Sequence, residues 1–134
     1  MAEPIAPVDV LLYSDNATTR AEVMAAVGRR AGKGLPEIRW DETATAEIAF
    51  KKAAAHEYAF MILDGEATKT GGMAVAKQLK QEVFNCPPLV LLIARPQDAW
   101  LAHWSEADRV LEYPLNPRAV QETVADIVAA TTQR

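Results

Sequence analysis

Two aspartates, Asp15 and Asp64, each come just after an apolar stretch of the chain. The run at 58–63 contains no charged residue, stops at Asp64 and is followed at once by Gly65. An apolar run of this length, bounded by turn residues, is typical of a strand buried on both faces. Because open α/β sheets place their chemistry at the carboxyl ends of parallel strands, Asp64 is the first candidate for a functional residue.

Carboxylates that meet at neighbouring strand ends point to one kind of chemistry. They repel each other, and keeping them ionised is costly unless a cation or water lies between them. Oxygen ligands from Asp15 and Asp64 suit Mg²⁺, and Glu66 would add charge or a hydrogen bond to the same crevice. An aspartate beside Mg²⁺ is also a nucleophile that can accept a phosphoryl group. The alternative is that both aspartates are strand-end turn residues that cap helices.

Alternating strand and helix patterns must position these side chains. Strands are predicted at 8–13, 37–40, 58–63, 89–94 and 109–113, and helices at 17–31, from Thr43 or Thr45 to 56, at 73–83, 97–106 and 117–131. Either Asn16 or Thr18 would cap the first helix. This alternation implies a doubly wound, flavodoxin-like α/β fold with a parallel sheet in the order 2-1-3-4-5. In that order the first and third strands are neighbours, so Asp15 and Asp64 come close together.

The composition is that of one folded domain. The chain has 134 residues, of which half are apolar, and we expect a loose leader at 1–7, a single domain at 8–131 and a tail at 132–134. A net charge of -4 argues against binding to nucleic acid. The single cysteine, Cys86, excludes an internal disulfide and fits a reducing cytoplasm. No signal peptide and no apolar run of about 18 residues is present, so direct membrane insertion is not expected.

These features together resemble the receiver domain of bacterial two-component response regulators, over about residues 7–131. The matching features are the order of elements, Asp15, Asp64, Gly72 eight positions beyond Asp64, and Pro114 after the last strand. The resemblance implies that Asp64 is the phospho-acceptor, that a histidine kinase is the phosphoryl donor, and that the protein is not an enzyme in its own right. It also implies a cis peptide bond before Pro114.

Five positions depart from the receiver pattern. Receivers carry two acidic residues after the first strand, and here the first of them is Ser14. The usual Met-Pro after the phospho-acceptor is replaced by residues 67–68. The Thr or Ser that ends the fourth strand is replaced by Ile93, and the Lys before the final proline by Tyr113. These last two are the positions through which receivers grip the phosphoryl group and switch.

The departures have an energetic consequence. Hydrogen bonds to charged groups contribute roughly 1.5–3 kcal/mol each, so the loss of a hydroxyl at 93 and a cation at 113 leaves little energy to drive a phosphorylation switch. We therefore expect an atypical, phosphorylation-independent pseudo-receiver in which Ile93 and Tyr113 fill the phosphate crevice. No cofactor is expected, or weakly bound Mg²⁺ only. With two histidines and one cysteine far apart, zinc is not expected either.

A protein partner is the expected output, because the chain ends soon after its last helix with no room for a DNA-binding domain. Receivers generally use the face of the fourth helix, fifth strand and fifth helix. Trp100 and Trp104 lie four apart on the predicted fourth helix and share a face, with His103 beside them. We expect these three residues to bind the partner; the alternative is that one Trp belongs to the core.

The sequence is compatible with three functions. The first is a stand-alone docking module that resembles atypical receivers of actinobacteria, some of which associate with the proton-pumping NADH:quinone oxidoreductase. That would place it at the cytoplasmic side of a membrane through its partner. The second is a working phospho-acceptor served by a histidine kinase. The third, a small flavodoxin-like enzyme or nucleotide binder, is disfavoured because residues 14–19 contain no glycine for a phosphate loop.

Overall fold

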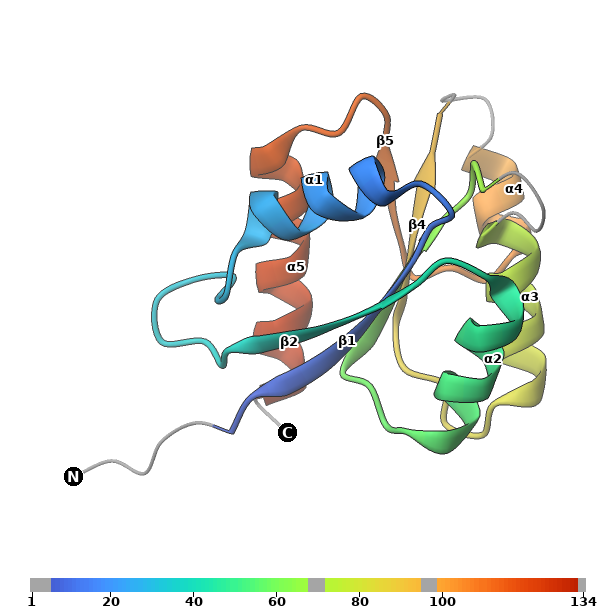
Figure 1. The fold of residues 1–134 in the computed structure, drawn as a ribbon, viewed down its shortest axis with the longest axis horizontal. Helices are drawn as coiled ribbons and strands as arrows, with labels where there is room; N and C mark the ends of the chain where they lie inside the picture. The colour runs from blue at the N-terminus through green and yellow to red at the C-terminus, as the bar shows by residue number, and fades with distance from the viewer. Residues whose placement is uncertain (1–5, 68–71, 95–98, 133–134) are drawn as a thin grey trace.

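A five-stranded parallel sheet with helices on both faces makes up the protein (Figure 1). The computed structural model describes residues 6–67, 72–94 and 99–132. In chain order its elements are β1 (Val8–Tyr13), α1 (Ala17–Val27), β2 (Ile38–Thr43), α2 (Ala46–Ala55), β3 (Phe60–Asp64), α3 (Gly72–Glu82), β4 (Leu89–Ile93), α4 (Ala99–Trp104), β5 (Arg109–Glu112) and α5 (Pro117–Thr132). The strand order β2-β1-β3-β4-β5 confirms the predicted flavodoxin-like topology.

Side-chain alternation along the strands divides the core into two halves. Figure 1 shows α1 and α5 on one face of the sheet, and α2, α3 and α4 on the other. Under α1 and α5 pack the buried strand residues Val10, Leu12, Phe60, Ile62, Val90, Leu92 and Leu111. Under α2 and α3 pack Leu11, Tyr13, Met61, Leu63, Leu89, Leu91 and Ile93. Each fully buried apolar side chain contributes about 1.5–3 kcal/mol, which explains why β4 is apolar throughout and β3 is apolar up to Asp64.

The first helix is shorter than the sequence pattern indicates. Its N-cap is Asn16, whose side-chain oxygen accepts from the backbone N–H of Thr18 at 2.9 Å. The helix ends at Val27, and the predicted end at residue 31 is wrong, because Gly28 adopts a left-handed φ of 76°. Its N–H donates to the carbonyl of Met24 at 2.7 Å and closes the last turn. Glycine favours this conformation because it has no Cβ.

Other helices and strands begin or end a few residues away from their predicted boundaries. β2 runs from Ile38 to Thr43 rather than 37–40, because its backbone pairs with β1 along the whole strand, from Val8↔Ile38 to Tyr13↔Thr43. β3 begins at Phe60 rather than at 58 and takes in Asp64 as its last residue. Thr45, not Thr43, caps α2. The predicted ends of the chain at 1–5 and 133–134, position 68, and the start of the fourth helix at 97–98 lie outside the described residues.

The backbone has one unusual peptide bond and no membrane-spanning helix among the described residues. The peptide bond between Tyr113 and Pro114 is cis, as the resemblance implied. Among the residues that the structure describes, no helix is both long enough and apolar enough to cross a bilayer.

Candidate functional site

Asp64 lies at the carboxyl end of the central strand β3 and is only 3% exposed. Its carboxylate accepts three hydrogen bonds. The Ser14 hydroxyl donates to Oδ2 at 2.7 Å, the Tyr113 hydroxyl to Oδ1 at 3.0 Å, and the backbone N–H of Glu66 also to Oδ1 at 2.9 Å. A carboxylate has about four lone-pair positions, so three of them are already used within the protein.

Ser14 is the first residue after β1 and is fully buried. Parallel pairing sets Tyr13 beside Leu63, so the next residue of each strand, Ser14 and Asp64, meet at the same edge. The Ser14 backbone N–H donates to the carbonyl of Thr43 at 3.1 Å, and its hydroxyl accepts from the N–H of Asn16 at 3.0 Å. The hydroxyl can also donate to the carbonyl of Asn16 at 3.4 Å, but the bond to Asp64 is much shorter.

Tyr113 follows β5 and reaches Asp64 past the intervening strand β4. Its backbone N–H donates to the carbonyl of Ile93 at 2.8 Å, which fixes the start of the turn. Burial raises the pKa of the Tyr113 hydroxyl above its ordinary value, and the nearby Asp64 carboxylate raises it further, although a hydrogen bond with Thr19 acts in the opposite direction. The phenol therefore stays protonated at neutral pH and donates to Asp64.

Gly65 allows β3 and β4 to approach each other beside the carboxylate. Its N–H donates to the Leu92 carbonyl at 2.8 Å. A Cβ at this position would lie 2.5 Å from the same carbonyl oxygen, closer than real Cβ contacts occur. Only glycine therefore fits directly after Asp64 without moving the backbone of β4.

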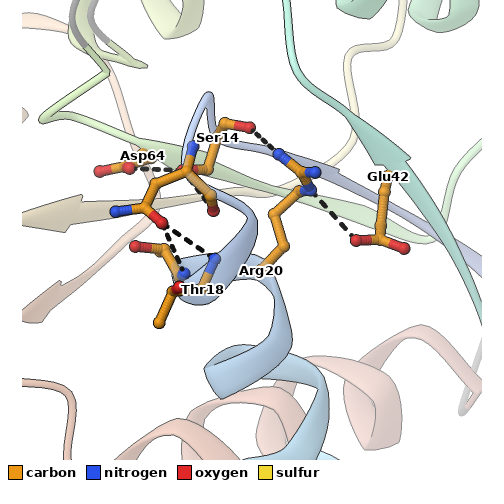
Figure 2. A network of polar contacts seen from close by, with 7 residues as sticks. Ser14, Thr18, Arg20, Glu42 and Asp64 are labelled. Carbon is orange, nitrogen blue, oxygen red and sulfur yellow. Dashed lines mark hydrogen bonds and ion pairs between the residues drawn. The ribbon is translucent and has the colours of Figure 1, made fainter.

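Arg20 supports the same edge from α1, as Figure 2 shows. Its Nη1 donates to the Ser14 carbonyl at 2.6 Å, and its Nε pairs with the Glu42 carboxylate on β2 at 3.1 Å. The Arg20 side chain is only 16% exposed. This arginine therefore ties α1, the turn after β1 and β2 together around the residue that contacts Asp64.

The predicted magnesium ligands are arranged less favourably than the prediction assumed. Asp15 and Glu66 are both exposed, and Glu66 reaches Asp64 through its backbone N–H. Within the described residues, no three His, Cys, Asp or Glu side chains gather as a metal site. Mg²⁺ prefers open carboxylate oxygens, and those of Asp64 already accept three hydrogen bonds. The residues present do not fit this cation well, and its binding by Asp15, Asp64 and Glu66 stays a prediction.

Ile93 and Tyr113 occupy the positions at which receivers hold a phosphoryl group, and they do so differently. Ile93 is fully buried and packs in the half of the core under α2 and α3. It offers no hydrogen-bonding group to the crevice. Tyr113 offers a hydroxyl rather than a cation, and that hydroxyl is already bonded to Asp64.

The predicted partner-binding residues lie on α4. Trp100 is 68% exposed and Trp104 is 51% exposed, so neither side chain is buried in the core. His103 is also exposed. Lys77 of α3 lies over the Trp104 ring with its Nζ 4.9 Å from the ring centre, and this cation–π contact orients the indole.

Sequence reasoning identified Asp64 but missed its donors. Ser14 and Tyr113 were recognised only as substitutions, not as hydrogen-bond donors to the carboxylate. Strand register is the signal that could have paired Ser14 with Asp64, since both directly follow the ends of neighbouring strands. Nothing in the pattern at 17–31 singles out Arg20, because its role depends on where α1 packs.

Comparison with curated proteins finds two close relatives. The chain is 43% identical over 121 residues to proteins of Mycobacterium tuberculosis strains CDC 1551 and H37Rv, each described as an uncharacterized response regulatory protein. The match covers 90% of this chain and 91% of each relative. No family model matches the chain.

Solved receiver domains share the fold at lower identity. The receiver domain of the Francisella response regulator 1452 superposes with a TM-score of 0.77 at 17% identity, covering 92% of this chain and 98% of that chain. The signal receiver domain of a signal transduction histidine kinase from Syntrophus aciditrophicus gives 0.78 at 15% identity, covering 95% and 94%. A chemotaxis protein of Vibrio cholerae gives 0.74 at 22%, covering 91% and 99%. These likenesses show the fold alone.

Proposed function

Because the chain belongs to the response regulators and has the fold of their receiver domain, we propose that it is a pseudo-receiver that docks on another protein without being phosphorylated. In this role it is not an enzyme, and Asp64 is a structural acid. The chain would bind its partner in a single conformation and would not change conformation on phosphorylation.

The observation that carries this proposal is the bonding of Asp64. Attack on a phosphoryl donor uses a lone pair of the carboxylate, and three of its roughly four lone-pair positions already accept hydrogen bonds, from Ser14, Tyr113 and the Glu66 N–H. A phosphoryl group on Asp64 would displace Tyr113 from its half-buried position and find no lysine there. The differential free energy that drives a receiver between two states is thereby reduced.

The docking surface in this proposal is the exposed face of α4. Trp100, His103 and Trp104 present two large aromatic side chains and an imidazole to solvent. Tryptophan supplies binding free energy out of proportion to its frequency at protein interfaces. The Lys77–Trp104 contact orders one of the rings before binding, which lowers the entropic cost of association.

Beryllofluoride with Mg²⁺, or acetyl phosphate, tests the proposal directly. The expected result is no stoichiometric adduct on Asp64 by intact mass and no change in tryptophan fluorescence. Asp64→Asn is expected to keep full binding to the native partner, whereas Trp100→Ala with Trp104→Ala is expected to weaken it at least about tenfold. A stable adduct accompanied by a structural change would refute the proposal.

A working phospho-acceptor is the second candidate, and one observation favours it. Asp64 stands at the carboxyl end of the central strand, where the doubly wound fold places its chemistry. In this case a histidine kinase would be the partner, Mg²⁺ a cofactor, and Asp64→Asn would abolish signalling. The same adduct experiment separates the two candidates.

For the partner itself, we propose a multisubunit respiratory complex of the NADH:quinone oxidoreductase type, with this chain as an accessory subunit. The resemblance to stand-alone actinobacterial receivers supports this choice. In this proposal the protein works in the cytoplasm and reaches the membrane surface through its partner. Affinity purification of the tagged chain from its native host tests it. Recovery of a histidine kinase in place of respiratory subunits would overturn it.

A further inference from the structure

A groove of about 1160 Å³ lies at the opposite edge of the sheet from Asp64. Its lining includes the residues just before β3 and β4 and the first residue of β5, together with the ends of α2, α3 and α5. Since all five strands run parallel, the amino ends of β3, β4 and β5 are far from the carboxyl end that carries Asp64. Trp100 and Trp104 do not line this groove.

Phe84 stands on this groove and is 92% exposed, the most exposed large apolar side chain among the described residues. It lies in the short loop between α3 and β4. Asn85 next to it has a left-handed φ of 53°, which turns the chain sharply, and Pro87 and Pro88 then lead into β4. The turn and the two prolines restrict the backbone of the loop, so the Phe84 side chain stays exposed to solvent.

Charge around the groove is negative and partly unbalanced. Of the four carboxylates on its lining, Asp108 pairs with Lys80 at 2.9 Å and Asp126 lies 3.9 Å from Arg109. Glu57 and Glu82 are exposed, and within the described part of the chain neither has a cation as partner. An exposed aromatic ring on the same groove as two carboxylates without an ion-pair partner matches a ligand that carries both apolar and positive groups.

We propose that this groove docks a basic amphipathic segment of a partner protein. Apolar side chains of the segment cover Phe84 and the prolines beside it, and its lysines or arginines lie against Glu57 and Glu82. Phosphate-bearing partners such as nucleic acid or anionic lipid are repelled by the same carboxylates. The proposal is independent of the docking face on α4, because the two surfaces share no tryptophan and each has its own variants.

A synthetic peptide of about 14 residues, built from Leu and Lys at helical spacing, tests the proposal. It is added to the uniformly ¹⁵N-labelled full chain, and amide shifts are followed by NMR. The expected shifts cluster at residues 83–88 and at the end of α5. Phe84→Ser should weaken binding at least about tenfold, whereas Ile48→Ser, which removes another exposed apolar side chain, should leave it unchanged.

The charged part of the proposal has its own variant. Glu57→Gln with Glu82→Gln should weaken the peptide several-fold and reduce the dependence of its affinity on salt. A peptide with Glu in place of Lys should not bind. Shifts that map to α4, or affinity unaffected by Phe84→Ser, would overturn the proposal. So would concentration-dependent dimerisation that Phe84→Ser abolishes, since the occupant would then be a second copy of the chain.

Discussion

The carboxyl ends and the amino ends of the parallel strands form two sides of the molecule that are built in opposite ways. We call them the carboxyl edge and the amino edge of the sheet. At the carboxyl edge the polar groups satisfy one another, with Asp64 bonded to Ser14 and Tyr113 inside the protein. At the amino ends of the strands Phe84 is exposed, and among the described residues Glu57 and Glu82 form no ion pair with a cation. Doubly wound folds usually bind their ligands at the carboxyl edge. In this molecule the exposed aromatic side chains lie elsewhere, near the amino ends of the strands at Phe84 and on α4 at Trp100 and Trp104.

Gly65→Ala should have the largest effect on the carboxyl edge. The new Cβ would meet the Leu92 carbonyl oxygen at 2.5 Å, so β3 and β4 must separate beside Asp64. We expect the free energy of unfolding in urea to fall by about 2–3 kcal/mol. Gly32→Ala is the matched control, because its Cβ would lie 3.4 Å from the flexible Leu35 side chain. Equal costs for the two variants would show that the close approach at Gly65 is not tight.

Tyr113→Phe should have the next largest effect, because it removes one donor from the buried carboxylate. A hydrogen bond to a charged group contributes roughly 1.5–3 kcal/mol when buried, and Tyr113 is only half-buried, so we expect a loss of about 1.5 kcal/mol. The ¹³C carboxyl resonance of Asp64 should shift as its partner is lost. An unchanged resonance would contradict the assigned bond, and with it the view that the crevice is internally satisfied.

Alkaline pH should lower the free energy of unfolding, because the Tyr113 hydroxyl loses its proton and can no longer donate to Asp64. Burial and then Asp64 raise the pKa of Tyr113 above its ordinary value of 10.0. Because the folded pKa is higher than the unfolded one, the stabilisation is complete below pH 10 and is lost as pH rises toward the folded pKa. After allowance for solvent screening, we expect at most about 1 kcal/mol between pH 10 and 11.

The variant Tyr113→Phe is the control for this titration. It should show a shallower fall in unfolding free energy above pH 10 than the wild type. Tyr58, whose hydroxyl donates to Asp41 at 2.6 Å, and Tyr13 both have a pKa that burial raises, so they contribute to the slope that remains. Identical slopes for wild type and variant would remove Tyr113 as the titrating group.

Phe84→Ser should have the smallest effect on stability, although it removes a large aromatic side chain. The ring is 92% exposed, so little apolar contact is lost and we expect a change below about 0.5 kcal/mol in urea unfolding. Phe60→Ala, at a fully buried position, should cost about 3–5 kcal/mol by comparison. A large loss in Phe84→Ser would show that the ring packs into the protein and is not held out for a partner.

Much of the fold could be predicted from the sequence, because apolar runs and helical periodicity report directly on burial. The uncharged run at 58–63 placed Asp64 at the edge of the sheet, and the strand order followed from the alternation of elements. Helix ends were less certain, since a left-handed Gly28 rather than a change in hydrophobicity stops α1. Asp41 and Glu42 are polar, so only pairing with β1 reveals them as strand residues.

The details of the site depended on three-dimensional packing that composition cannot report. The Tyr113 hydroxyl reaches Asp64 across a neighbouring strand, which requires a particular rotamer and turn. The groove is assembled from segments 53–59, 80–88, 108–109 and 126–131, which lie far apart in the chain. Exposure of both Trp100 and Trp104 could not be distinguished in advance from the alternative with one ring in the core.

The hydrogen bond from Tyr113 to Asp64 also affects how the outer strand β5 separates from the sheet. β5 has only four residues, and on its outer side no further strand pairs with it in the described sheet. An edge strand leaves a row of backbone N–H and C=O groups unpaired, and foreign chains can pair with them when the strand is accessible. Here Tyr113, which follows β5, is hydrogen-bonded to Asp64 on the central strand β3. Separation of β5 from the sheet must therefore also expose the buried Asp64 carboxylate. Native-state exchange of the β5 amides should therefore follow the cooperative opening of the interior rather than local unravelling.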